Sequence, residues 1–120
     1  MKVYLSGPMS GIRDNNFPAF DAAAHALRAR GINVVNPAEL NPCPEPPKED
    51  AEAWGQFYNT CLRADLRAMM DCDAIALLPG WQRSSGANLE LHVAHRVGMD
   101  VLFVDVLLAE LAQVAEAVAP

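Results

Sequence analysis

The chain of 120 residues is long enough for one compact domain with a single core and too short for two. Hydrophobic residues make up 52% and charged residues 20%, which is typical of a folded domain rather than a disordered chain. The net charge of −6 disfavours a nucleic-acid polymer as partner, although backbone N–H groups can still hold a single phosphate. Neither a signal-peptide core nor a run of ~18 apolar residues is present, so we expect a cytoplasmic protein that does not bind membranes.

The first part of the chain alternates an apolar run with a helical pattern. Residues 3–6 are apolar up to Ser6 and end at Gly7, which predicts a strand. Asn16 can cap the helix that follows, and Gly31 can end it. A second strand is expected directly afterwards, over residues 32–35.

A proline-rich segment then interrupts the alternation. Residues 37–47 contain five prolines and form the one long irregular connection. A connection of this length in a small domain can be the wall or lid of a site. It can equally be a surface excursion, and the sequence leaves both alternatives open.

The second part of the chain continues the alternation of helices and strands. Helices are predicted over 51–70, 86–97 and 107–118, with buried strands over 74–78 and 101–104. Strands that alternate with helices predict a parallel sheet with right-handed crossovers. We therefore predict one α/β domain over residues 1–120, with a three-layer flavodoxin-like or Rossmann-like fold, strand order 2-1-3-4 and helices on both faces.

In such a sheet, ligands bind beyond the carboxyl ends of the strands. Three segments leave those ends: residues 6–13, the pair Asn36-Pro37, and residues 80–86. These segments are also the polar, glycine-rich parts of the chain. Composition and topology therefore indicate one edge of the sheet as the site.

Glu90 is the only charged residue on one face of the third predicted helix. The other residues of that face are small or apolar: Gly86, Ala87, Val93, Ala94 and Val97. A buried carboxylate costs several kcal/mol unless other groups compensate it, so its presence on such a face indicates a function. The alternative is a carboxylate that reaches water at the edge of the helix.

Asp65 and Tyr4 are two further candidates for the same site. Asp65 lies on or beside the apolar stripe of the second helix, where it could act with Glu90 or form a salt bridge. Paired carboxyl groups suit glycosidic chemistry, in which one attacks or stabilises the anomeric carbon and the other handles protons or holds the sugar. Tyr4, near the end of the first strand, could hydrogen-bond Glu90 or simply be a half-buried strand residue.

The start of the third helix offers an anion site. Ser84, Ser85 and Gly86 combine hydroxyl and free N–H groups at a helix N-terminus, although Ser85 could be an ordinary N-cap. Arg13 could add charge for a phosphate, and Trp81 could stack on a base; a surface arginine and a tryptophan covering the core are the alternatives.

A metal site is not expected. His92 and His95 have a spacing that can chelate a metal, but no third ligand and no HExxH motif accompany them. The three cysteines match no zinc pattern either.

Taken together, these motifs resemble the nucleoside 2-deoxyribosyltransferase-like superfamily. The segments that carry the likeness are YLSGPMSG at the start, NP after the second strand, DL in the second helix, CDAIALLPGW, and SSGANLELHVAHRVGMDV. The likeness covers about residues 1–104 and leaves out the last predicted helix. It is strongest to a branch frequent in phage and prophage genomes, related to the 2′-deoxynucleoside 5′-phosphate N-hydrolases.

This resemblance implies cofactor-free cleavage of an N-glycosidic bond through a covalent glycosyl-enzyme intermediate. It identifies Glu90 as the nucleophile, with Asp65 and Tyr4 as its catalytic partners. Ser84 stands where the nucleoside transferases have Asp and the nucleotide N-hydrolases have Ser, which favours a nucleoside 5′-monophosphate. The expected substrate and phosphate contacts are Ser84, Ser85, Gly86, Gly7, Arg13 and Ser6, and the expected base contacts are Met9, Trp81 and Asn36.

The resemblance also implies a homodimer or a larger homo-oligomer. Base exchange by a nucleoside deoxyribosyltransferase remains an alternative to hydrolysis. A non-catalytic nucleotide-binding or sensing module, or a protein-interaction subunit, would keep the fold without the chemistry. The presence of Tyr4, Asp65 and Glu90 together favours an enzyme, because a binding module does not need a carboxylate beneath the sugar.

Overall fold

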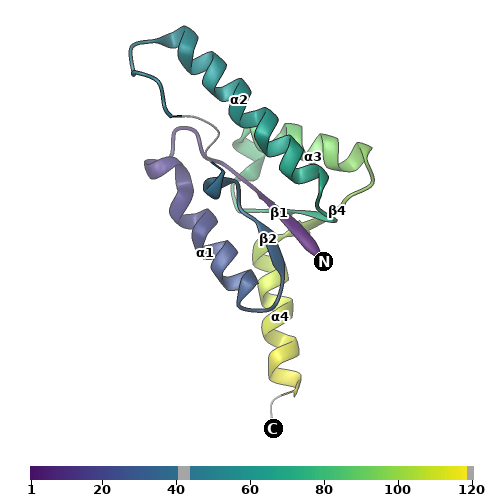
Figure 1. Cartoon of the computed structure of the whole chain (residues 1–120). Coiled ribbons are helices and arrows are strands. Elements are labelled where there is room, and N and C mark those ends of the chain that lie inside the picture. Colours follow the sequence, from purple (N-terminus) through teal and green to yellow (C-terminus); the bar gives the residue numbers. More distant parts are fainter. Residues whose placement is uncertain (41–43, 119–120) are drawn as a thin grey trace.

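The computed structural model describes residues 1–40 and 44–118 and forms one four-stranded parallel sheet (Figure 1). The strand order is β2-β1-β3-β4, as predicted. Central strand β3 is an unbroken apolar run and is buried over its full length, because helices cover both of its faces. The strands are β1 (Lys2–Ser6), β2 (Asn33–Val35), β3 (Ala74–Leu77) and β4 (Asp100–Phe103).

Four helices complete the three layers. Helices α1 and α4 pack on one face of the sheet, and α2 and α3 lie on the other (Figure 1). Their bounds are α1 (Phe17–Arg28), α2 (Ala51–Met70), α3 (Ser85–Arg96) and α4 (Val104–Val118). Three short 3₁₀ helices that the sequence did not reveal lie in the loops: η1 (Arg13–Asn16), η2 (Pro37–Glu39) and η3 (Trp81–Arg83).

The alternation of side chains along β1 divides the interior into two parts. Val3 and Leu5 point to the face covered by α1 and α4, where they join a fully apolar core. Tyr4 and Ser6 point to the face covered by α2 and α3. Both are buried and both carry a hydroxyl group, so this second face is the only one on which β1 presents polar side chains.

The carboxyl edge of the sheet depends on a close contact between two loops. Gly7 follows β1, and a Cβ atom there would lie 2.8 Å from the Cβ of Leu78, which follows β3. Glycine therefore allows the loops after β1 and β3 to approach each other. The β1–α1 loop then turns through three left-handed residues, Asp14, Asn15 and Asn16, which are residue types that tolerate positive φ.

Several predicted boundaries change in the structure. Helix α4 starts at Val104 rather than residue 107, because Val104 is buried in the core and the helix begins directly after β4. Asn16 precedes α1 as predicted, but its side chain does not cap the helix and donates to the carbonyl of Pro8 instead. The proline-rich segment includes residues outside the described ranges, so the choice between wall and surface excursion stays a prediction.

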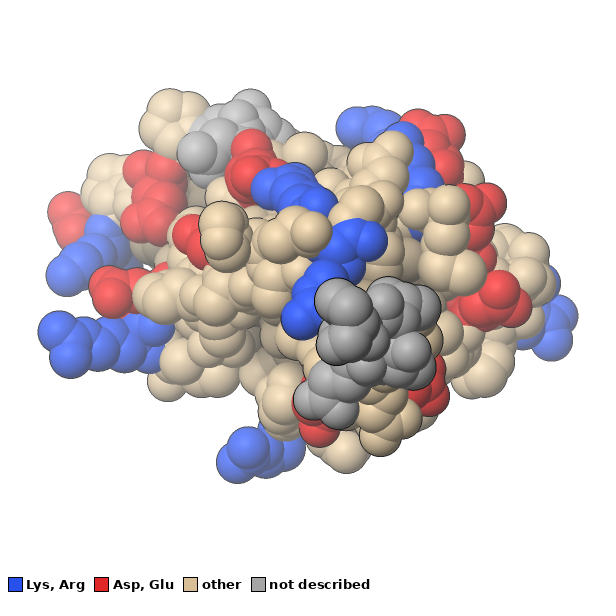
Figure 2. All heavy atoms as spheres, turned by 90° about the horizontal axis from the view of Figure 1, so that it is seen from below, with Lys and Arg blue, Asp and Glu red and all other residues tan. Residues whose placement is uncertain are grey.

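The surface seen from below in Figure 2 intermixes Lys and Arg with Asp and Glu, without a large patch of one sign. Within the described residues, the helices are too short or too polar to span a bilayer.

Candidate active site

The carboxylate of Glu90 lies buried between α3 and β1. Its Oε2 accepts a hydrogen bond of 2.7 Å from the Tyr4 hydroxyl, and its Oε1 accepts one of 2.6 Å from the Ser6 hydroxyl. Only 6% of Glu90 is exposed, so these two bonds replace the water that a carboxylate would otherwise bind. The side chain therefore faces a sheltered, polar environment rather than bulk solvent.

Local sequence explains how this contact forms. Tyr4 and Ser6 are two residues apart on one strand, so their side chains share a face and reach one oxygen each. On α3, Ala87 and Ala94 are buried beside Glu90. Because these neighbours are small, the helix can approach the sheet closely enough for Glu90 to reach both hydroxyls.

Asp65, on α2, is the second carboxyl group at this site. Burial and the nearby charge of Glu90 raise its pKa to about 7. Burial also raises the pKa of Glu90, but there the hydrogen bonds from Ser6 and Tyr4 favour the charged form. The structure thus brings Tyr4, Asp65 and Glu90 together and gives the two carboxyl groups unequal surroundings.

Tyr4 remains a hydrogen-bond donor at any physiological pH. Burial, followed by the charges of Glu90 and Asp65, raises the pKa of its phenol far above the ordinary value. The hydroxyl therefore keeps its proton, which it donates to Glu90.

The N-terminus of α3 is organised by Ser84 and not by Ser85. The hydroxyl of Ser84 accepts a hydrogen bond of 3.1 Å from the Ala87 N–H, which makes Ser84 the N-cap. Ser85, the other candidate for that role, is the exposed first residue of the helix. Gly86 lies in the same turn, next to Ser84.

Asn88 supports this turn and was missed by the sequence analysis. Its side-chain amide donates to the backbone carbonyls of Trp81, Gln82 and Ser84, at 2.8–3.4 Å. It thereby fixes η3 against the start of α3. An asparagine three residues after Ser85, the predicted cap, was the only available signal, and it is a weak one.

Of the three proposed base contacts, Met9 and Asn36 lie on the α1 side of the sheet and Trp81 lies on the other side. Met9 packs against the core on the α1 and α4 side, and the amide of buried Asn36 bonds the Asp21 carboxylate of α1. Trp81 packs on the core beside α2 and α3, 6.5 Å from the ring of Phe103 between centroids. Arg13 is exposed at the start of η1. The roles of these residues in binding stay predictions.

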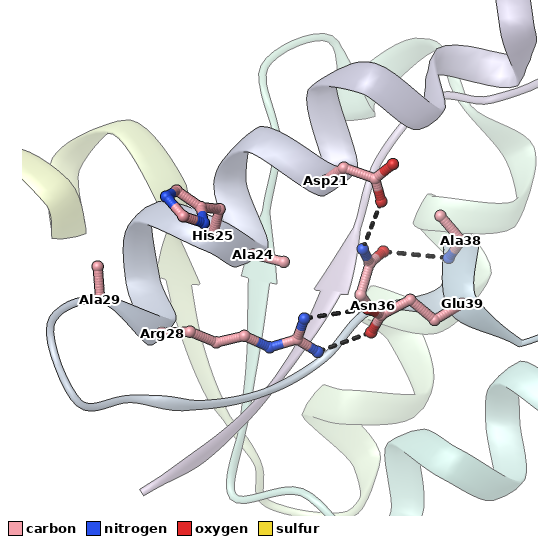
Figure 3. A pocket seen from close by; sticks show the side chains of 8 residues that line it. All are labelled: Asp21, Ala24, His25, Arg28, Ala29, Asn36, Ala38 and Glu39. Atoms are coloured by element: carbon pink, nitrogen blue, oxygen red, sulfur yellow. Dashed lines mark hydrogen bonds and ion pairs between the residues drawn. The ribbon is translucent and has the colours of Figure 1, made fainter.

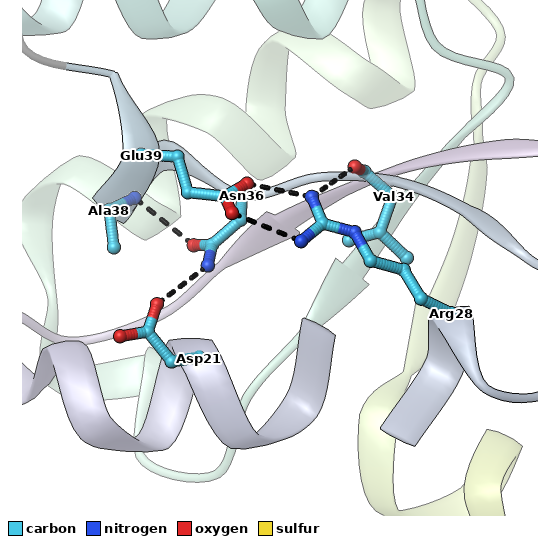
Figure 4. Close-up of polar contacts among 6 residues, drawn as sticks. All are labelled: Asp21, Arg28, Val34, Asn36, Ala38 and Glu39. Carbon is cyan, nitrogen blue, oxygen red and sulfur yellow. Dashed lines mark hydrogen bonds and ion pairs between the residues drawn. The ribbon is translucent and has the colours of Figure 1, made fainter. Parts of the chain in front are cut away.

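A hollow of about 630 Å³ lies away from Glu90, between α1 and η2 (Figure 3). Arg28 crosses it, pairing with Glu39 at 2.7 Å and donating to the backbone carbonyl of Val34, while Asn36 bonds Asp21 and the N–H of Ala38 (Figure 4). The hydrogen bond between Arg28 and Glu39 raises the pKa of the Arg28 guanidinium and lowers the pKa of the Glu39 carboxyl group. These polar groups are engaged with one another and hold η2 against α1, which indicates a structural role.

Metal ligands do not gather at the site. In residues 1–40 and 44–118, no three His, Cys, Asp or Glu side chains lie close enough to hold a metal ion. His92 and His95 are both exposed on α3.

Comparison with known proteins adds a family and a fold relative. Residues 1–103 match a family model described as a domain of unknown function, DUF4406. Among solved structures, the chain is similar to a 2-deoxyribosyltransferase from the psychrotolerant bacterium Bacillus psychrosaccharolyticus, with a TM-score of 0.62 and 25% identity over 86% of this chain and 71% of that chain. That enzyme is described as a biocatalyst for the synthesis of nucleosides. Among curated proteins, none matches this sequence.

Proposed function

This chain belongs to the DUF4406 family and to the nucleoside 2-deoxyribosyltransferase-like superfamily, and from that premise we propose that it cleaves the N-glycosidic bond of a nucleoside 5′-monophosphate. At the coarser level, it is an enzyme that processes nucleosides by glycosyl transfer or hydrolysis. The observation that carries the finer proposal is the buried Glu90 carboxylate, held by two hydroxyl groups beside a second carboxyl group.

The two carboxyl groups suit a double-displacement mechanism. Glu90 attacks the anomeric carbon, and the electron pair of the breaking C–N bond passes to the leaving base. Asp65, whose pKa of about 7 leaves it partly protonated at neutral pH, donates a proton to that base. Water then attacks the same carbon, Asp65 takes up a proton from it, and Glu90 leaves as a carboxylate.

The start of α3 is our candidate phosphate site. The hydroxyl oxygen of Ser84 already accepts from Ala87, so its hydrogen can point outward to a phosphate oxygen. The free N–H groups of the first helical turn, at Ser85 and Gly86, add further donors and the positive end of the helix dipole. A carboxylate at position 84 would repel the phosphate, whereas a hydroxyl does not.

The remaining assignments extend this proposal along the edge of the sheet. Gly7 and Arg13 would contribute to phosphate binding, and Met9, Trp81 and Asn36 would contact the base after rearrangement on binding. The proposal also includes assembly into a homodimer or larger homo-oligomer and a location in the cytoplasm.

Incubation with a panel of nucleoside 5′-monophosphates tests it directly. Chromatography should detect free base and sugar 5-phosphate with the wild-type protein, and Glu90→Ala should reduce release by at least about 10³-fold. Glu52→Ala, which removes an exposed carboxylate from α2, is the matched control and should retain full activity. Binding without release of base, in every reaction, would show a nucleotide-binding module instead.

Base exchange is the second candidate, because the similar solved enzyme is a deoxyribosyltransferase. Adding a different free base to the reaction distinguishes the two. Formation of a new nucleoside or nucleotide would identify a transferase, and release of the sugar phosphate alone would identify a hydrolase.

A further inference from the structure

Ser6 is the last residue of β1, and its side chain contacts Glu90 from inside the sheet. Ser6 was predicted to be a substrate or phosphate contact, but its hydroxyl points inward and donates to Oε1 of Glu90 at 2.6 Å. Ser6 is 1% exposed, so it cannot reach a phosphate at the surface of the molecule. Its contact is with the proposed nucleophile.

We propose that Ser6 is a positioning residue whose hydroxyl fixes Oε1 of Glu90. Together with the Tyr4 hydroxyl, it stabilises the charged form of Glu90, so that the one proton bound by the two carboxyl groups resides on Asp65. This inference rests on the proposed function for its catalytic meaning. The distribution of one proton over the two carboxyl groups can be measured without any substrate.

The two carboxyl groups accept different numbers of hydrogen bonds. Glu90 accepts one hydroxyl hydrogen on each oxygen, from Ser6 and from Tyr4. Among the hydrogen bonds of the described residues, none is donated to Asp65. Hydrogen bonds to a carboxylate favour its charged form, so Glu90 is the group that keeps the negative charge and Asp65 the group that takes the proton.

Other charged groups around Glu90 do not reverse this distribution. Among the described residues, the titratable side chains that interact with the charge of Glu90 are Tyr4 on β1 and Asp65 on α2. Strand β3 contributes the apolar side chains of Ile75 and Leu77 to the same core. Neither Tyr4 nor Asp65 supplies a positive charge that would stabilise the ionised form of Glu90. The two hydroxyls are therefore the groups that can do so.

This distribution matches what the reaction requires. A nucleophile must be ionised before it attacks, and a general acid must hold a proton at the same moment. Ser6 and Tyr4 also bind both oxygens of Glu90, which fixes the plane of the carboxylate relative to the sugar.

Carboxyl titration by carbon-13 NMR on the full-length protein tests the inference without substrate. Ser6→Ala removes a single oxygen atom and should raise the pKa of Glu90 by about one unit, the size expected for one hydrogen bond to a charged group, and lower that of Asp65. Ser6→Cys, a weak donor of similar size, should give a smaller shift in the same direction. Glu90→Gln and Asp65→Asn assign the two signals.

The pH–rate profile provides the second measurement. In Ser6→Ala, the acidic limb of kcat/KM should move upward by about one pH unit, so that the rate on that limb falls about tenfold. Thr60→Ala removes an exposed hydroxyl from α2 and should change neither the profile nor the titration.

Unchanged titration of both carboxyl groups in Ser6→Ala would overturn the inference, even if the rate fell. A protein that releases no base, but whose carboxyl groups shift as described, would refute the proposed function and support the role of Ser6. The two failures are therefore distinguishable.

Discussion

At the residue scale, the burial of Asp65 beside the charge of Glu90 should make the folded protein less stable as the pH rises. The pKa of Asp65 is raised from 3.8 to about 7 in the folded state, so between these values the folded chain holds a proton that the unfolded chain has released. The stabilisation that comes from this extra bound proton is complete below about pH 4 and is lost as the pH rises through about 7. Allowing for the partial exposure of Asp65, we expect the loss to be about 1–2 kcal/mol.

Urea unfolding of Asp65→Asn measures this contribution. The amide cannot ionise, so the variant should gain stability relative to wild type as the pH rises from about 4.5 to 8. Asp71→Asn, which removes an exposed carboxylate at the end of the same helix, should show no such trend. A difference between Asp65→Asn and wild type that does not change with pH would contradict the raised pKa.

The hydrogen bond between Tyr4 and Glu90 should contribute a measurable coupling energy. A double-mutant cycle with Tyr4→Phe and Glu90→Gln, followed by urea unfolding, should give a coupling of about 1–3 kcal/mol, because the bond is buried and its acceptor is charged. Replacing Glu90→Gln in the cycle by Glu52→Gln, an exposed residue, should give effects that simply add. Additivity in the first cycle would mean that the 2.7 Å contact contributes nothing.

Sequence reasoning singled out Glu90 but did not predict the hydrogen bond that Ser6 donates to it, for a physical reason. A lone charged residue on an apolar helix face can be recognised from the sequence, because helical periodicity alone defines the face. The partner of a buried strand hydroxyl depends on which helix covers that face of the sheet, and periodicity does not reveal it. The alternation along β1 did place Tyr4 and Ser6 on the same face, which is a signal that was available.

At the scale of elements, two glycines should respond in opposite ways to alanine. Gly7→Ala places a Cβ 2.8 Å from the Cβ of Leu78, a contact that only a backbone shift can relieve, and should cost about 1–3 kcal/mol. Gly55→Ala lies in α2 with open space around the new methyl group and should stabilise the protein by about 0.5–1 kcal/mol. Thermal unfolding of both variants checks this, and destabilisation by Gly55→Ala would contradict the described environment of α2.

The cap of α3 gives a second prediction at this scale. Ser84→Ala removes the acceptor for the Ala87 N–H and should destabilise the protein by about 1 kcal/mol, whereas Ser85→Ala, one residue later, should have little effect. If Ser84 also donates to phosphate, its variant should raise KM for nucleotides more than for nucleosides. Equal destabilisation by the two variants, measured by urea unfolding, would contradict the assignment of the cap.

The order of the elements was predictable, whereas the loops between them were less so. Apolar runs and helical periods gave all four strands and all four helices, and right-handed crossovers limited the topology. The 3₁₀ helix η3 depends on Gly80 at a φ of 87° and on the side-chain bonds of Asn88, and hydrophobic periodicity reveals neither of these local features. The start of α4 at Val104 was missed because an apolar strand end and an apolar helix start look alike in sequence.

At the scale of the whole molecule, the family match and the folded unit do not coincide. The match ends at residue 103, yet the core between the sheet and α1 includes Val104 and is covered by α4. Three leucines of α4 pack on that core: Leu107, Leu108 and Leu111. Arg30, which follows α1, also donates a hydrogen bond to the backbone carbonyl of Leu111. We therefore expect α4 to be part of the single domain.

Truncation tests this expectation. A chain ending at Phe103 would expose the apolar surface that α4 covers, and should lose cooperative unfolding and bind the dye ANS. A chain ending at Val114 keeps all three leucines and should unfold in a single cooperative transition. The second truncation removes only residues 115–120 and leaves the leucines of α4 in place. Cooperative unfolding of the shorter chain would show that the sheet and three helices form a self-sufficient domain, with α4 as an appendage.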